Sequence, residues 1–211
     1  MEPRTVSLEP PARSVFEGVL SPDQPRCVDA IQLSRYNNDH FDRGGSRIKE
    51  ALWTVVRCLF FMPAWPMPSR LRCTLLRLFG ARIGQGVVIR SRVQVTFPWR
   101  LTIGDHTWIG EEVNLHNLAP ITIGHNVCLS QRAFLCTGSH DFTELGFDLK
   151  TGPINISDHS WIAANAFVAP NVELGPHAMV TAGSMVKRSV TTPGIISGNP
   201  ATLKERLEVN G

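Results

Sequence analysis

The sequence contains no block of basic residues and no long apolar run, and each absence excludes a class of protein. Lys and Arg number 21 against 18 Asp and Glu, which gives a formal net charge of +3. Because the basic residues form no tract, we do not expect nucleic acid as the main partner. The longest apolar stretch covers residues 51–62 and includes Arg57. It is shorter than the roughly 20 residues that a membrane-spanning helix needs.

The sequence also lacks a Cys-x-x-Cys pair. Its five cysteines are irregularly spaced, at Cys27, Cys58, Cys73, Cys128 and Cys136. An odd number at such spacing indicates reduced thiols rather than a disulfide framework. The first residues show no signal-peptide pattern. We therefore expect a cytoplasmic protein.

The sequence does contain a ladder of apolar residues at six-residue spacing between residues 83 and 186. Its fifteen rungs are Ile83, Ile89, Val95, Ile103, Ile109, Leu115, Ile123, Leu129, Leu135, Ile156, Ile162, Val168, Leu174, Val180 and Val186. A repeat this regular is typical of a solenoid, and a period of six indicates a parallel β-helix. One unit forms one short side and three sides close a triangular coil, so the rungs predict about five coils. Four residues after each rung stands a second, mostly small residue, as expected at a tight corner.

Insertions interrupt the ladder, and all of them fall at the third corner of a coil. The step to the next rung is eight residues after Val95 and after Leu115, and twenty-one after Leu135. The largest insertion is predicted to form a loop over residues 141–153. Loops gathered along one edge of a repeat scaffold usually carry the binding function. We therefore expect the functional site at this corner.

Three segments flank the ladder domain, which we place at residues 81–192. Residues 1–45 are polar and have no sustained period, so we expect a partly disordered or loosely draped arm. Residues 46–80 are predicted to form two helices. The tail, residues 193–211, is predicted to contain a short helix from Leu203 to Val209.

The first of these helices begins after Ser46, a favourable N-cap residue, and has two interpretations. In one, it packs across the open end of the β-helix, since terminal repeats need caps. In the other, residues 51–65 make peripheral membrane contact. The lipid-facing side chains would then be Trp53, Phe60, Phe61 and Trp65.

His140 is the candidate catalytic residue. It follows the rung Leu135 by five positions, so its side chain should point outward, and it begins the long loop. An imidazole titrates near pH 6.5 and can accept a proton at neutral pH, which suits a general base.

The other histidines do not form a metal-binding pattern. His106, His159 and His177 each stand three residues after a rung, and the last two are expected to stack on adjacent coils. Metal-dependent β-helix enzymes such as the gamma-class carbonic anhydrases carry paired histidines five residues apart. His140 has no such partner at position 135 or 145, so we expect no metal site.

The ladder, the sequence GSHDF at 138–142 and the segment TAGSMVKRSVTTPGIISGNPA at 181–201 resemble the hexapeptide-repeat acetyltransferases. The resemblance covers about residues 46–206 and is closest to the polysaccharide O-acetyltransferases of colanic acid biosynthesis, relatives of the galactoside and maltose enzymes. It implies a left-handed β-helix and a homotrimer. It also implies that acetyl-CoA lies in a groove between neighbouring β-helices.

The resemblance further implies roles for individual residues. His140 matches the catalytic histidine of the family. The coenzyme-binding positions that it implies are Ala164, Ala182, Gly183, Lys187, Arg188 and Asn199. For the substrate-binding asparagine of the galactoside enzymes, Asn114, Asn117 and Glu112 are alternatives, of which Asn114 is favoured. Asp141 and Glu144 lie near His140 in sequence; Asp141 is a second candidate for substrate binding, and either could orient the imidazole.

The expected reaction moves the acetyl group of acetyl-CoA to a sugar hydroxyl, with His140 removing the proton. N-acetylation of an amino sugar is an alternative, because the same base can serve an amine. Serine acetyltransferases carry a larger helical N-terminal domain than this chain offers. The remaining alternative is a non-catalytic β-helix that acts as a scaffold or a sugar-binding module.

Overall fold

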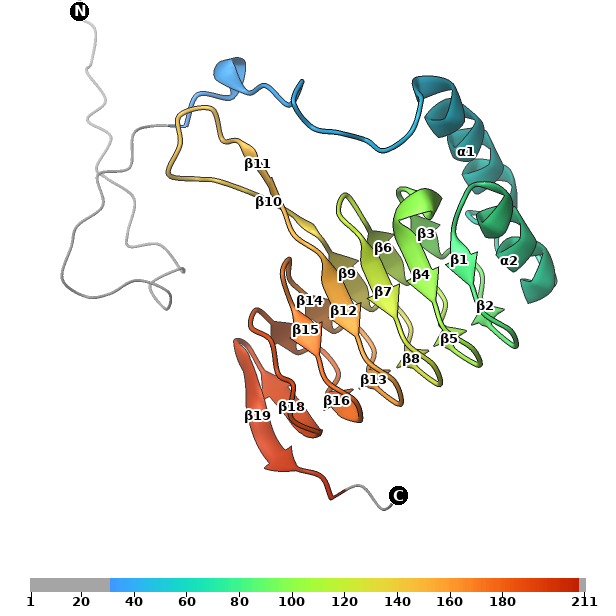
Figure 1. The fold of residues 1–211 in the computed structure, drawn as a ribbon, viewed down its shortest axis with the longest axis vertical. Helices are drawn as coiled ribbons and strands as arrows, with labels where there is room; N and C mark the ends of the chain where they lie inside the picture. The colour runs from blue at the N-terminus through green and yellow to red at the C-terminus, as the bar shows by residue number, and fades with distance from the viewer. Residues whose placement is uncertain (1–30, 209–211) are drawn as a thin grey trace, which may run out of the picture.

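Short parallel strands stacked in three flat sheets build most of the molecule (Figure 1). The computed structural model describes residues 31–208. We name the three sheets A, B and C in the order in which the chain first enters them. The chain passes through all three in turn and then starts the next coil. This is the parallel β-helix that the six-residue period predicts.

The strands of each sheet come from successive coils. Sheet A contains β1 (Arg82–Ile83), β4 (Leu101–Ile103), β7 (Ile121–Ile123), β12 (Ile154–Ile156) and β15 (Glu173–Leu174). Sheet B contains β2 (Val88–Ile89), β5 (Trp108–Ile109), β8 (Cys128–Leu129), β13 (Trp161–Ile162), β16 (Ala178–Val180), β18 (Gly194–Gly198) and β19 (Ala201–Arg206). Sheet C contains β3 (Gln94–Val95), β6 (Asn114–His116), β9 (Phe134–Cys136), β14 (Phe167–Val168) and β17 (Met185–Val186).

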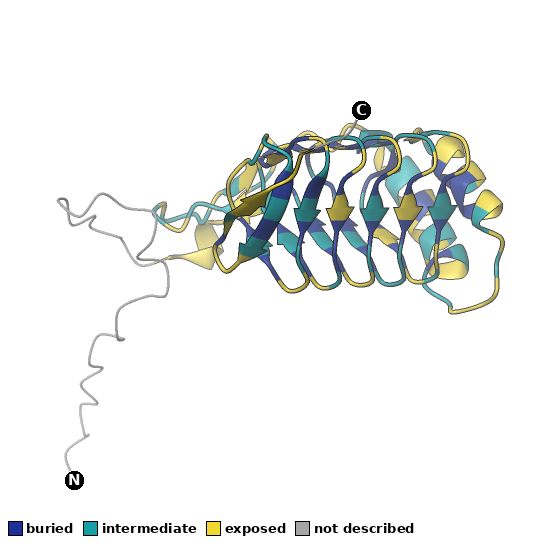
Figure 2. Cartoon of the chain, turned by 90° about the horizontal axis from the view of Figure 1, so that it is seen from below, coloured by how far each residue is buried: buried dark blue, intermediate teal, exposed yellow. Residues whose placement is uncertain are grey.

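The rungs form the core. Fourteen of the fifteen are buried, and only Ile83, at the end covered by helices, is half-buried. Rungs of neighbouring coils pair in register; Ile103, for example, pairs with Ile123. Figure 2 shows buried positions recurring in every turn of the solenoid. The glycines after the rungs are spatially required, since an added Cβ at Gly104 would lie 2.6 Å from the backbone of Gly124.

A sixth turn extends the predicted five coils. Val190 bridges Leu174 in parallel, and β18 continues sheet B with Ile196 fully buried. The helix predicted from Leu203 to Val209 is wrong. Residues 203–206 instead belong to β19, which pairs antiparallel with β18. The last parallel strand would otherwise expose an unpaired edge, and β19 satisfies those backbone groups.

Two helices close the other end of the solenoid: α1 (Arg47–Phe60) and α2 (Ser69–Leu78). Ser46 caps α1 as predicted, with its hydroxyl accepting from the backbone N–H of Lys49 at 3.2 Å. Trp53, Phe61 and Leu76 are buried in one cluster with the first rungs. The Trp53 indole also donates to the Val95 carbonyl at 2.9 Å. This is the arrangement that the capping interpretation predicts.

The burial of Trp53 and Phe61 corrects part of the membrane interpretation, because these two predicted lipid-facing rings face the core rather than solvent. Trp65 is exposed. Within residues 31–208, no helix combines the length and apolar character needed to cross a bilayer.

Candidate active site

The large insertion leaves the solenoid at the corner between sheet C and sheet A. There β10 (Gly138–His140) and β11 (Leu149–Thr151) form an antiparallel hairpin that extends away from the coils (Figure 1). The loop predicted over residues 141–153 is therefore partly a strand. Ser139 is the small corner residue four positions after the rung Leu135, and it is exposed because the chain has already left the coil at Gly138.

His140 ends β10 and is held on three sides. Its Nδ1 lies 2.8 Å from the carbonyl oxygen of Phe147. Its ring stacks on the Phe147 ring, with centroids 4.3 Å apart and an angle of 4° between the planes. Tyr36 covers it at a centroid distance of 5.7 Å. The imidazole is thus half-buried rather than fully exposed.

The contact with Phe147 determines the tautomer of the neutral ring. A carbonyl oxygen can only accept, so Nδ1 carries the proton and donates it. The second ring nitrogen, Nε2, is then the basic one. A backbone carbonyl orients the histidine; the sequence had left this partner open, with Asp141 and Glu144 as neighbouring candidates. Phe147 lies seven residues beyond His140, and only the loop geometry brings them together.

Asp141 is engaged within the same loop. Its carboxylate forms an ion pair with Lys150 and accepts from the hydroxyl of Thr143 at 2.6 Å and from the Thr143 backbone N–H at 3.0 Å. These interactions, that with Lys150 first, hold the pKa of Asp141 well below its usual range. The carboxylate therefore closes the loop, and a role for Asp141 in substrate binding stays a prediction.

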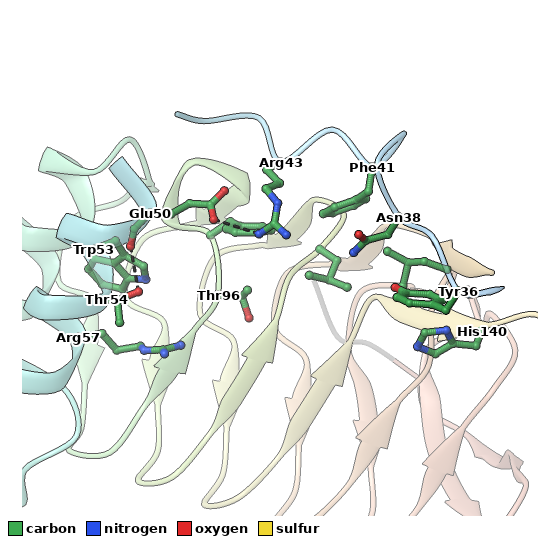
Figure 3. A pocket seen from close by; sticks show the side chains of 13 residues that line it. Tyr36, Asn38, Phe41, Arg43, Glu50, Trp53, Thr54, Arg57, Thr96 and His140 are labelled. Atoms are coloured by element: carbon green, nitrogen blue, oxygen red, sulfur yellow. Dashed lines mark hydrogen bonds and ion pairs between the residues drawn. The ribbon is translucent and has the colours of Figure 1, made fainter. Parts of the chain in front are cut away.

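A cavity of about 390 Å³ adjoins His140 (Figure 3). Its wall comes from the segment before α1, from α1 itself and from the corner between sheets C and A. The lining residues include Tyr36, Asn38, Phe41, Arg43, Glu50, Thr54, Arg57, Thr96, Phe97, Leu118 and His140. Volumes of about 300–1,000 Å³ are usual for small-molecule sites.

The segment of residues 31–45 covers this corner. The Gln32 backbone N–H donates to the Leu145 carbonyl in the hairpin loop at 2.8 Å. Farther along, the Trp99 indole donates to the Arg43 carbonyl at 2.8 Å. Residues 1–30 of the predicted arm lie outside the described residues. The described part is draped over the candidate site, and sequence reasoning missed its contribution because the segment has no periodicity.

His116 is a second histidine near the hairpin. It ends β6, and its Nδ1 lies 3.3 Å from the hydroxyl of Thr96. Burial lowers its pKa, so the neutral imidazole is favoured. Thr96 lines the cavity of His140. His116 directly follows the rung Leu115, a position that gives no signal of function in the sequence.

Of the three candidates for the substrate-binding asparagine, Asn117 is engaged by the backbone. It is fully buried, and its Oδ1 accepts from the N–H groups of Thr96 at 3.0 Å and Phe97 at 2.9 Å. Its amide nitrogen donates to the Phe97 carbonyl at 2.6 Å. Asn117 therefore shapes the third corner and cannot also bind a substrate.

Glu112 is also occupied, between Arg92 at 3.0 Å and Arg132 at 2.7 Å. Hydrogen bonds from these guanidinium groups, that from Arg132 first, lower the pKa of its carboxyl group. Asn114 lies on the outer face of sheet C and lines a separate depression together with Phe134. Within one chain, the structure does not bring Asn114 and His140 into the same cavity.

Four of the six predicted coenzyme positions come together at the corner between sheets B and C. The Gly183 N–H donates to the Ala164 carbonyl at 2.9 Å, and Ala182 and Asn199 occupy the same corner in successive turns. Ala182, Gly183 and Asn199 are exposed. Gly183 has φ +69° with no atom within 4 Å of an added Cβ. Small residues thus leave an accessible strip of backbone.

Lys187 and Arg188 lie elsewhere, at the corner between sheets C and A, just after β17. They share this corner with the hairpin of His140, two coils away. Because neighbouring strands lie about 4.8 Å apart, that separation is roughly 10 Å along the solenoid axis. Sheet C separates them from the strip of Ala164, Ala182 and Gly183.

The predicted stacking of His159 and His177 is confirmed, with ring centroids 5.0 Å apart and an angle of 13°. Among residues 31–208, no group of three or more His, Cys, Asp or Glu side chains is arranged to hold a metal ion.

Comparison with known proteins supports the resemblance. The protein named colanic acid biosynthesis acetyltransferase WcaF in Escherichia coli K12 is 45% identical to this chain over 167 residues. The matched residues cover 79% of this chain and 92% of that protein. No family model matches.

Two solved structures share the fold. A hexapeptide-repeat acetyltransferase from Vibrio cholerae, complexed with acetyl coenzyme A, has a TM-score of 0.71 at 24% identity, covering 83% of this chain and 97% of the other. A galactoside acetyltransferase in complex with coenzyme A has a TM-score of 0.69 at 19% identity, covering 76% of this chain and 82% of the other.

The fold is the left-handed β-helix of the hexapeptide-repeat acetyltransferase structures. Within that class, the chain belongs to the acetyltransferase family that includes the Escherichia coli colanic acid protein.

Proposed function

We propose that the protein transfers the acetyl group of acetyl-CoA to a hydroxyl of a sugar or polysaccharide precursor, with His140 as the general base. The observation that carries this proposal is the 2.8 Å contact between His140 Nδ1 and the Phe147 carbonyl. It makes Nε2 the basic nitrogen of a half-buried imidazole beside a cavity. The family relationship supports the acetyl transfer, and the names of the relatives suggest the saccharide acceptor.

In the proposed reaction, His140 Nε2 removes the proton as the sugar oxygen attacks the thioester carbonyl. The Phe147 carbonyl stabilises the imidazolium that forms, because it accepts from Nδ1. The carbon–sulfur bond then breaks, and the imidazolium returns the proton to the leaving thiolate. General base action of this kind contributes about 10²–10⁴-fold to the rate.

The coenzyme positions favour a homotrimer. Ala164, Ala182 and Gly183 lie before the strands of sheet C, at the corner with sheet B. Lys187 and Arg188 lie after these strands, at the corner with sheet A. A single chain therefore does not bring them to one binding surface. In a trimer, the strip of one chain faces the basic corner of its neighbour. Light scattering should give three times the chain mass of 23.3 kDa.

A screen of sugar acceptors with acetyl-CoA tests the function, with free thiol as the readout. Thermal unfolding with acetyl-CoA alone provides a second, independent measurement. A ligand at 100 times its dissociation constant adds about 2.7 kcal/mol to the free energy of unfolding, whereas a non-catalytic scaffold gains nothing. Amino sugars in the same screen distinguish N-acetylation from O-acetylation.

We also propose that α1 contacts an anionic membrane surface. Its solvent side carries an apolar stripe at helical spacing, made of Ile48 (74% exposed), Leu52 (56%), Val55 (56%) and Leu59 (55%). Residues 46–82 contain seven Lys or Arg and one Glu, although the whole chain has a net charge of only +3. An apolar stripe on a basic segment is the pattern of interfacial helices.

Flotation with lipid vesicles tests this contact. The protein should bind vesicles that contain phosphatidylserine and should not bind pure phosphatidylcholine vesicles. Leu52→Glu should abolish the binding, whereas Thr74→Glu, which adds the same charge at an exposed position of α2, should largely retain it. If Leu52→Glu instead changes the oligomeric mass, the stripe contacts another copy of the chain and the membrane proposal is wrong.

A further inference from the structure

The cavity beside His140 has a second end, built by one face of α1. Glu50, Thr54 and Arg57 follow one another at spacings of four and three residues, so they project from the same side of the helix. Figure 3 shows them across the cavity from His140, with Thr96 between.

Two polar atoms at this end have no partner. Glu50 Oε1 and Arg57 Nε are buried and make no hydrogen bond within the described residues. The other oxygen of Glu50 pairs with Arg43 at 3.0 Å. Buried polar groups in folded proteins nearly always have a partner. Because both atoms belong to residues that line one cavity, they indicate a ligand that supplies both an acceptor and a donor.

The charged residues at the α1 end of the cavity indicate that the ligand carries a negative charge. Arg43 and Arg57 provide two positive charges, and Glu50 provides one negative charge. Because Glu50 already pairs with Arg43, the charge of Arg57 is left over for the ligand. Arg binds carboxylate and phosphate groups with two parallel hydrogen bonds, which makes it the preferred residue for such anions.

The remaining walls suit a sugar ring. Phe41 and Phe97 stack on one another with centroids 6.4 Å apart, and both line the cavity together with Tyr36. Aromatic rings provide flat apolar surfaces on which the C–H face of a pyranose can pack. The volume of about 390 Å³ lies in the range of small-molecule sites.

We infer that this cavity is the acceptor subsite and that it takes a sugar carrying an anionic group, a carboxylate or a phosphate. Arg57 binds the anion, the Glu50 carboxylate accepts from a sugar hydroxyl, and the hydroxyl to be acetylated lies toward His140. The inference rests on the proposed acetyl transfer, but it assigns residues and a substrate class that the family relationship does not.

Calorimetric titration of the full chain, without acetyl-CoA, tests the inference. The probes are p-nitrophenyl glucuronide and p-nitrophenyl glucoside, which share a ring and differ in the carboxylate. The glucuronide should bind at least about tenfold more tightly, the effect of roughly one charged hydrogen bond. The second pair of probes is glucose 1-phosphate and glucose. A preference for the charged sugar in only one of the two pairs identifies whether the cavity binds a phosphate or a carboxylate.

Arg57→Gln should remove the preference for the charged sugar and leave the affinities for the glucoside and for acetyl-CoA unchanged. Arg57→Lys, which keeps the charge, should retain part of the preference. The matched control is Arg47→Gln, since Arg47 is exposed on the same helix and lies outside the cavity. If Arg57→Gln fails to fold, Glu50→Gln serves instead; it releases the charge of Arg43 and should increase the preference for the charged sugar.

The binding measurement separates this inference from the proposed function. Selective binding that depends on Arg57, with no thiol release from any acceptor, would contradict the transferase proposal and leave the subsite in place. Equal affinity for charged and neutral sugars, equal losses for both in Arg57→Gln, or no binding of any probe would overturn the subsite.

Discussion

The two corners that border sheet C differ in construction. At the corner between sheets B and C, the chain turns without insertions. Its first three coils carry the ion-paired side chains Arg92, Glu112 and Arg132, whereas the later coils carry Ala164, Ala182 and Gly183. At the corner between sheets C and A, insertions and the segment of residues 31–45 build a cavity above the coils. The corner between sheets B and C therefore exposes backbone, whereas the corner between sheets C and A encloses a cavity lined by side chains.

This difference indicates a division of labour between the two corners. An accessible strip of backbone suits an extended ligand that lies along the solenoid, such as the pantetheine arm of acetyl-CoA. A walled cavity suits a compact acceptor whose hydroxyl groups must be recognised one by one. Four substitutions, one at the open corner and three at the enclosed corner or its loop, test that division.

The largest effect is expected for His140→Ala at the enclosed corner. The loss of the base should lower kcat by about 10²–10⁴-fold and leave the affinity for acetyl-CoA unchanged. Steady-state thiol release and thermal shift with acetyl-CoA measure the two quantities. His177→Ala, at the opposite corner between sheets A and B, is the control and should be active. Near-normal turnover of His140→Ala would exclude the imidazole as the base.

A smaller effect is expected for Ala182→Leu on the open corner. Added bulk on the strip should weaken acetyl-CoA binding roughly tenfold, the consequence of about 1–2 kcal/mol of steric conflict, with the acceptor affinity unchanged. Gln131→Leu places the same side chain at the equivalent corner position two coils earlier, where no coenzyme contact is proposed. Equal acetyl-CoA affinity of both variants would contradict the proposed groove.

Tyr36→Ala tests the cover of His140 by the N-terminal segment. An aromatic contact contributes about 0.5–1.5 kcal/mol, so the loss should change the acceptor KM or kcat by roughly two- to tenfold. Tyr36→Phe keeps the ring and should behave as the parent chain. Initial rates at varied acceptor concentration are the measurement. Parent-like kinetics of Tyr36→Ala would mean that the segment covers the site without contributing to it.

The smallest effect is expected for Asp141→Asn in the hairpin loop. The folded-state pKa of Asp141 is lowered by Lys150 and Thr143. Its stabilising contribution is therefore present above the unfolded pKa of about 4 and lost as the pH falls below that value toward the folded pKa. Melting temperatures at about pH 6 should be lower in the variant, and the difference should shrink at about pH 3. Asp148→Asn is the control in the same loop.

Much of the fold was predictable because the signal is periodic. Every rung except Ile83 is buried, and the helices at residues 47–60 and 69–78 appear where capping residues and apolar spacing indicate them. Errors arose where the period ends. Ser139 left the coil with the hairpin, and residues 203–206 paired as a strand against an edge that local sequence does not reveal.

The candidate site was predictable only in part. His140 stood out by its place after a rung and before the long insertion. Its orienting partner did not, because the Phe147 contact is made by a backbone carbonyl, which any residue can supply. The cavity residues Tyr36 and Arg57 come from non-repeating segments, so no spacing connects them with His140.

The sequence by itself determined the solenoid, because a six-residue period of apolar side chains can be buried in only one simple way, along the axis of a three-sided coil. It also determined which corner carries the insertion and its histidine. The tertiary structure alone decided what surrounds that histidine. Contacts between the hairpin and the segment of residues 31–45 join parts of the chain about a hundred residues apart, and such contacts leave no local pattern.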